Sequence, residues 1–166
     1  MADNPFPDAP KHLPDLLAAY AAQHEQFARR YRGLSRDTLT ARPVAGRWSL
    51  LELLCHVVDA DLVMSDRIKR TIAMDRPLLC EYDESAYVRT LGYQERDASA
   101  EIALFENNRR HMAPILKRLD ETAWQRVGVH SQRGEFTLFV LVQYSVGHAN
   151  HHYGFIAEKC RALGID

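Results

Sequence analysis

The chain has 166 residues and a mass of 19.0 kDa, a length that fits one domain with its own core, so residues 1–166 are expected to form a single domain. Its 21 Lys and Arg are balanced by 22 Asp and Glu, and a formal net charge of −1 argues against nucleic-acid binding. The three cysteines are widely spaced without a CxxC pair, which argues against a disulfide framework or a zinc knuckle.

The N-terminal segment is rich in acids and prolines. Because it lacks a basic stretch followed by an apolar run, we expect residues 1–10 to be a flexible arm and not a signal peptide. No later apolar stretch reaches the roughly 18 residues that a membrane span needs. A soluble, cytoplasmic protein is therefore expected.

The first two helices are predicted from apolar residues that recur every three or four positions. The first covers residues 11–32, with Pro14 suited to its first turn and Gly33 to its end. The second has the clearest start in the chain, because Ser49 and Glu52 form an S-x-x-E capping-box pattern. This helix is predicted to begin at Leu50 and to end near residue 73.

The third helix is predicted from a cap at Asp97 or Ser99 to about residue 119, with a kink at Pro114. About 23 residues separate it from the second helix, far more than usually joins antiparallel neighbours in a bundle. A crossover of that length can run along the bundle and let the second and third helices point the same way.

The fourth helix is predicted from Thr137 to residue 163, with Gly134 before it and Gly164 after it. Sustained alternation of apolar and polar residues is missing apart from a short stretch at residues 126–130, so a sheet-based fold is not expected. Together the four segments predict an all-α four-helix bundle.

Three of the eight histidines predict a metal site. His148 and His152 are one helical turn apart, and both lie on the apolar stripe of their helix with Leu141 and Ile156. His56 lies on the apolar stripe of the second helix. Buried imidazoles are costly unless they are paired, and a metal ion is one efficient partner. Three imidazoles would hold one divalent ion, zinc or nickel, and leave a position open for water or substrate.

Neighbouring polar residues have weaker assignments. Asp59 or Glu52 could hydrogen-bond an outer imidazole nitrogen or could be solvated helix charges. His151 lies on the polar margin of its helix, which suits an outer or surface role, while Tyr144 and residues 81–87 could line a substrate cleft or serve in packing. Four further histidines have no partner at ligand spacing: His12, His24, His111 and His130.

Other metal and catalytic motifs are missing from the sequence. It has no paired Glu-x-x-His segments of di-iron bundles, no His-Glu-x-x-His motif, no G-x-S-x-G elbow and no glycine-rich nucleotide loop. Cys55 is adjacent to His56, but it should point about 100° away around the helix. It is therefore predicted to be a packed core thiol and not a ligand.

Several of these segments resemble one family. The run RWSLLELLCHVVDAD at residues 47–61 resembles the second-helix signature of the DinB-like superfamily. HANHHYGFI at residues 148–156 and RALG at residues 161–164 resemble its H-x-x-H-H helix and R-x-L-G ending, and GEFTL at residues 134–138 resembles the segment that leads into that helix. The resemblance covers essentially the whole chain.

This resemblance implies a four-helix bundle of up-down-down-up topology, metal ligands at His56, His148 and His152, and frequently a homodimer. It implies no DNA binding. Similar proteins include bacillithiol S-transferases and mycothiol-dependent maleylpyruvate isomerases, and this chain has no evident second domain of the kind found in the isomerases.

Three hypotheses follow from the sequence. The first is an enzyme whose metal ion activates either a low-molecular-weight thiol for S-transfer or a water for hydrolysis of a small-molecule substrate. The second is a non-catalytic, metal-stabilised or metal-sensing bundle that acts through a partner. In the third, the histidines bind no metal and are satisfied by buried water or carboxylates.

Overall fold

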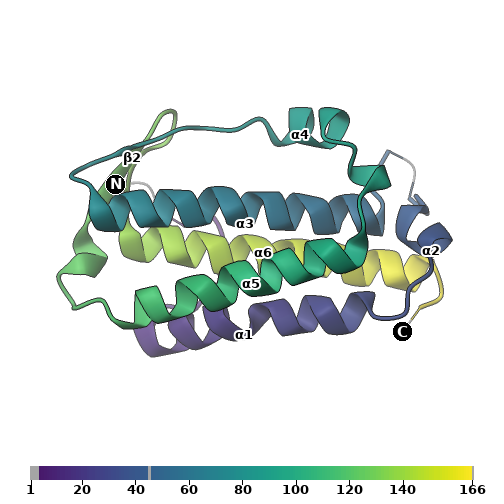
Figure 1. Cartoon of the computed structure of the whole chain (residues 1–166), viewed down its shortest axis with the longest axis horizontal. Helices are drawn as coiled ribbons and strands as arrows, with labels where there is room; N and C mark the ends of the chain where they lie inside the picture. Colours follow the sequence, from purple (N-terminus) through teal and green to yellow (C-terminus); the bar gives the residue numbers. More distant parts are fainter. Residues whose placement is uncertain (1–3, 45, 166) are drawn as a thin grey trace.

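Four long helices form the body of the molecule, which is described here from a computed structural model covering residues 4–44 and 46–165. They are α1 (Leu13–Tyr31), α3 (Leu50–Ala73), α5 (Ala98–Lys117) and α6 (Leu138–Ala162). These bounds lie within about two residues of the predicted ones, and the predicted four-helix bundle is confirmed (Figure 1).

Side-chain caps fix the starts of three of these helices. The Ser49 hydroxyl accepts a hydrogen bond from the Glu52 N–H at 3.1 Å, and the Glu52 carboxylate accepts one from the Ser49 N–H at 2.7 Å, which completes the predicted capping box. Of the two caps considered for α5, Asp97 is the one observed. The Thr137 side chain caps α6. Each cap satisfies a backbone N–H that the helix itself leaves without a partner.

The helices follow the up-down-down-up order. In Figure 1, α1 and α6 run from left to right, whereas α3 and α5 run from right to left. Each of α1 and α3 packs against both α5 and α6. The crossover of residues 74–97 returns along the bundle and contains α4 (Glu84–Thr90) and the short 3-10 helix η1 (Tyr93–Glu95). Its length is what allows α3 and α5 to be parallel.

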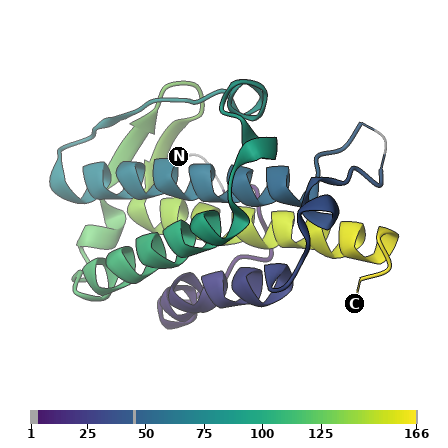
Figure 2. The ribbon, with the colours of Figure 1, turned by 45° about the vertical axis from the view of Figure 1, so that its right-hand side comes forward.

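A small three-stranded sheet was not predicted. β1 (Leu78–Leu79) pairs in parallel with β2 (Val127–His130), which pairs antiparallel with β3 (Gly134–Thr137). Figures 1 and 2 place the sheet and α4 on the same side of the bundle, over α3. The short alternation of apolar and polar residues at positions 126–130 coincides with β2. The two residues of β1 carry no pattern of their own and form a strand only because β2 lies beside them.

Two further short helices lie in the connections: α2 (Arg36–Thr40) precedes α3, and the 3-10 helix η2 (Ala123–Gln125) precedes β2. Buried apolar side chains fill the bundle in two clusters, one around Phe27 and Phe105 and the other around Ile68 and Met112. None of the described helices combines the length and the apolar character needed to cross a membrane.

A charged pair is buried in the middle of the bundle. The Arg109 guanidinium is fully buried and lies 2.7 Å from the Asp61 carboxylate. Asn108 and Ser145 donate further hydrogen bonds to Asp61 at 2.7 and 3.2 Å, and Arg109 donates to the Tyr20 carbonyl at 3.3 Å. This network joins all four long helices close to the histidines of α3 and α6.

Candidate metal centre

The structure brings the three predicted ligands together. His56 is in the second turn of α3, and His148 and His152 are one turn apart on α6. The Nε2 atom of His56 lies 3.2 Å from the Nε2 atoms of both His148 and His152. Their ligand atoms lie within 4.8 Å of one another, and this is the only such group of three His, Cys, Asp or Glu among the described residues.

The spacing of these nitrogens fits a metal ion. On a tetrahedral ion with bonds of about 2.0–2.1 Å, neighbouring nitrogen ligands are about 3.3–3.4 Å apart. The observed 3.2 Å separations are close to this value. Three convergent nitrogens use three coordination positions and leave at least one for another ligand, as in catalytic zinc sites.

The protonation state of the three imidazoles also suits ligation. Burial lowers the pKa of His56 to about 4 and that of His152 to about 3, and the neighbouring histidines contribute to the shift at His152. Burial, together with His152 and His56, holds the pKa of His148 well below its usual 6.5. All three rings are therefore neutral at pH 7, which is the form that binds metal.

The predicted partners of the outer imidazole nitrogens lie elsewhere. Asp59 accepts hydrogen bonds from the Tyr93 hydroxyl at 2.7 Å and from Arg96 at 3.2 Å. It follows His56 by three residues, which places it about 60° around the helix, on the side that faces η1. Within the described part of the chain, Nδ1 of His56 and Nδ1 of His152 are buried without a hydrogen-bond partner.

Glu52 likewise serves the helix start and not an imidazole. Its carboxylate accepts hydrogen bonds from the Ser49 N–H and from Nε of Arg42, the latter at 3.1 Å. Burial acts to raise the pKa of Glu52, but these two donors outweigh it, so the pKa lies below its usual value. Of the two roles considered for Asp59 and Glu52, the hydrogen bond to an outer imidazole nitrogen is therefore not formed by either residue.

A cleft of about 920 Å³ lies beside the three histidines. His148 and His152 are part of its wall, together with Tyr144 and residues 81–85 of the crossover. Of residues 81–87, which could line a cleft or serve in packing, Ala86 and Tyr87 are not part of this wall. The Tyr144 ring is stacked on the His148 ring, with 6.2 Å between centroids and 14° between planes. The volume is that of a typical small-molecule site.

One acidic side chain of the crossover reaches the histidines. Oε2 of Glu84, the first residue of α4, lies 3.9 Å from Nε2 of His56. Sequence reasoning included Glu84 only as a member of residues 81–87, because no local pattern distinguishes it from its neighbours Glu81 and Asp83. Asp83 instead caps α4 through the N–H of Ala86.

Part of the predicted N-terminal arm lies on α6 and closes one side of the cleft. The Phe6 ring is 5.1 Å from Tyr144, 5.9 Å from His148 and 5.6 Å from His151, measured between centroids. Gly147 permits this contact, because a Cβ atom there would lie 2.4 Å from Cβ of Phe6. His151 is exposed and lies outside the group of three, in agreement with its expected outer position.

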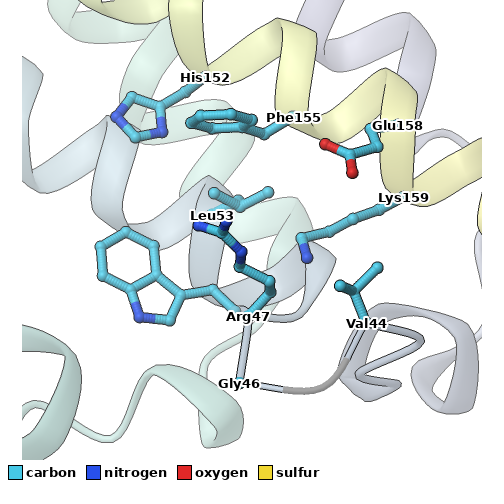
Figure 3. A pocket seen from close by; sticks show the side chains of 9 residues that line it. Val44, Gly46, Arg47, Leu53, His152, Phe155, Glu158 and Lys159 are labelled. Carbon is cyan, nitrogen blue, oxygen red and sulfur yellow. The ribbon is translucent and has the colours of Figure 1, made fainter.

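A second, smaller cavity of about 270 Å³ borders the same centre. Figure 3 shows His152 and Phe155 at one edge of this cavity, with Arg47, Glu158 and Lys159 around the remainder. His152 lines both cavities, so the candidate metal centre lies between them.

The fold and the site define a helical bundle with a three-histidine candidate metal centre. The family model described as the DinB superfamily matches residues 19–156. The chain therefore belongs to the DinB superfamily, and the predicted family is confirmed.

Several relatives and solved structures are similar to this chain. A protein of Geobacillus thermodenitrificans is 24% identical over 155 residues, which cover 93% of this chain and 82% of that protein. A protein of Oceanobacillus iheyensis is 21% identical over 128 residues, which cover 77% of this chain and 74% of that protein. Both carry names that assign them provisionally to the metal-dependent hydrolases.

The structure of YfiT from Bacillus subtilis, described as a probable metal-dependent hydrolase with an unusual four-helix bundle topology, matches with a TM-score of 0.86 at 19% identity, covering 92% of this chain and 88% of YfiT. The DinB-like protein YjoA of Bacillus subtilis matches with a TM-score of 0.62 at 18% identity, covering 92% and 94%. These two likenesses establish the fold.

Proposed function

We propose that this protein is a metal-dependent hydrolase of a small-molecule substrate. His56, His148 and His152 would hold one divalent ion, zinc or nickel, at the wall of the large cleft. The observation that carries the proposal is the convergence of three neutral imidazoles beside a cleft of about 920 Å³, with Nε2 of His56 3.2 Å from Nε2 of each of the other two. The provisional names of the relatives point to the same class of reaction.

The bound ion would lower the pKa of a water in its open position and polarise the bond to be cleaved. The chain supplies the proton transfer. Oε2 of Glu84 lies 3.9 Å from Nε2 of His56. In the proposed reaction Glu84 would take a proton from the attacking water as the oxygen of that water bonds to the substrate, and would then return the proton to the leaving group. Phe6 and Tyr144 cover the His148 side of the centre and restrict bulk water there.

Thiol transfer is the second candidate. A cleft of about 920 Å³ is large enough for a low-molecular-weight thiol together with an electrophile, and Glu84 would then take the proton of the thiol. Product analysis separates the two reactions, since S-transfer gives a thioether or thioester and hydrolysis incorporates oxygen from water.

Metal analysis tests the site itself. After incubation with Zn²⁺ or Ni²⁺ at pH 7.5, we expect one ion per wild-type chain by elemental analysis. His152→Ala should weaken metal binding at least about 100-fold, because even the loss of an outer partner of a ligand costs 10–100-fold. His151→Ala is the matched control and should keep the wild-type affinity. Equal losses in the two variants, or no bound ion in the wild type, would contradict the assignment.

Activity measurements test the role of Glu84. With a panel of small esters and amides, Glu84→Gln should keep the metal stoichiometry but lose about 10²–10³-fold in kcat, a normal contribution of a general base. A wild-type rate in this variant would remove Glu84 from the mechanism.

Removal of the ion is a separate test. Unfolding of the protein by a chelator would identify the ion as structural and favour the non-catalytic hypothesis.

A further inference from the structure

Arg67 is a buried arginine that has no carboxylate partner among the residues described by the structure. It lines the large cleft, and it is 8% exposed. One of its amino groups donates to the Cys80 carbonyl at 2.6 Å, the other contacts the Met64 sulfur at 3.7 Å, and the guanidinium lies 5.9 Å from the centre of the Tyr82 ring. Its Nε atom is buried without a hydrogen-bond partner among the described residues. None of the ion pairs in residues 4–44 and 46–165 includes Arg67. A buried charge normally has a counter-charge, whereas the contacts of Arg67 given above are all with neutral groups.

Two more donors lie beside Arg67 in the cleft. Arg133, in the turn between β2 and β3, donates to the Tyr144 hydroxyl at 3.1 Å. Nδ1 of His130 accepts hydrogen bonds from the backbone N–H groups of Gln132 and Arg133 at 3.2 and 3.3 Å. The ring proton is therefore on Nε2, which becomes a donor. All three side chains line the same cleft. Burial and the charges of both arginines lower the pKa of His130.

The acidic residues that line the cleft are Glu81, Asp83 and Glu84, and none of them forms an ion pair with Arg67 or Arg133 in the part of the chain that the structure describes. Glu81 is close enough to oppose the shift at His130, but the ion pairs of the described residues do not join it to Arg67 or Arg133. Glu84 is directed to His56 instead. The three residues Arg67, His130 and Arg133, called here the cationic end of the cleft, thus offer several hydrogen-bond donors to an anion.

The cationic end is aligned with the candidate metal centre. Arg67 follows His56 by eleven residues on α3, which is about three turns, so the two residues lie on the same face of the helix roughly 16 Å apart along its axis. Ala60 and Met64 lie between them and line the same cleft. The Cα–Cβ bond of Arg67 tilts back toward the start of α3, which shortens the distance that a substrate must span.

We propose that the cationic end binds a carboxylate or phosphate group of the substrate. The proposal rests on the function proposed above and narrows its substrate class to anionic small molecules in which a spacer separates the acidic group from the bond that is cleaved. Guanidinium groups favour both anions, because their fixed N–H donors match two oxygens at once.

Titration calorimetry of the metal-loaded protein with glutarate and, separately, with inorganic phosphate tests this site and distinguishes the two anions. Arg67→Met and Arg133→Met should each weaken binding of the preferred anion at least about tenfold. Arg70→Met, on the same helix in an exposed ion pair, is the matched control and should bind as the wild type. Because Arg133 is exposed, its variant remains informative if Arg67→Met does not fold.

The same titration with His148→Ala identifies an anion held by the metal ion. If the proposal holds, His148→Ala binds the anion and the two arginine variants do not. The reverse pattern, with binding lost only in His148→Ala, would overturn it.

A pair of esters links the site to turnover. We expect the enzyme to hydrolyse 4-nitrophenyl glutarate, which carries a carboxylate, with a kcat/KM at least about tenfold higher than that for 4-nitrophenyl butyrate. Arg133→Met should abolish this preference. If neither ester is hydrolysed while the arginine variants still lose anion binding, the hydrolase function fails and the anion site stands. If both esters are hydrolysed equally and the arginine variants bind normally, the anion site fails and the hydrolase function stands.

Discussion

Removal of the Asp61 carboxylate should cost this protein a large part of its stability. Among the residues that the structure describes, Asp61→Ala would leave the fully buried Arg109 guanidinium with only the Tyr20 carbonyl, the Ser145 hydroxyl and the rings of Tyr20 and Phe105 as partners. Breaking a buried ion pair in this way costs about 3–5 kcal/mol, out of a total of about 5–15 kcal/mol for a domain. At about 2–4 °C per kcal/mol for a chain of this size, the melting temperature should fall by roughly 6–20 °C.

Urea denaturation followed by far-UV circular dichroism at pH 7 measures this loss. A chelator should be present, because bound metal would add its own stabilisation. The double variant with Asp61→Ala and Arg109→Met should be more stable than Asp61→Ala alone, since it leaves no unpaired buried charge. Asp66→Ala, which breaks an exposed ion pair on the same helix, should leave the midpoint nearly unchanged. The reasoning is refuted if Asp61→Ala lies within about 1 kcal/mol of the wild type, or if the double variant is the less stable one.

Three further outcomes are expected. The pKa of Glu52 is lower in the folded protein than its usual 4.5, so the ionised carboxylate contributes to folding stability above pH ~4.5, and this contribution is lost as the pH falls through the folded pKa. The difference in stability between the wild type and Glu52→Gln should therefore shrink on acidification below pH ~4.5. Alkylation of the native protein with iodoacetamide at pH 8 should modify the exposed Cys80 and spare the two buried cysteines, and mass spectrometry showing two or three labels would contradict the burial. Gly147→Ala should displace Phe6 and make the N-terminal arm more sensitive to protease, whereas Gly154→Ala, with open space around its Cβ, should leave cleavage unchanged.

The sequence by itself determined the four helices and the three histidines. Helix starts are local features, because Ser49, Asp97 and Thr137 each bond to a backbone N–H only three residues away. The positions of His148 and His152 within an apolar stripe are also local, since helical periodicity fixes which residues share a face. These signals were sufficient to place both imidazoles toward the core before any contact was known.

Tertiary structure alone decided the remaining parts of the site. Glu84 meets His56 across 28 positions of chain. Arg67 and Arg133 line the same cleft only because the turn between β2 and β3 lies near α3. The two acids of the family-like segment, Asp59 and Asp61, pair with arginines that follow them by 37 and 48 positions. Such contacts depend on the crossover and on how the helices pack, and no periodicity of the chain encodes them. The candidate ligands could therefore be predicted from sequence, whereas the groups that would hold and orient a substrate could not.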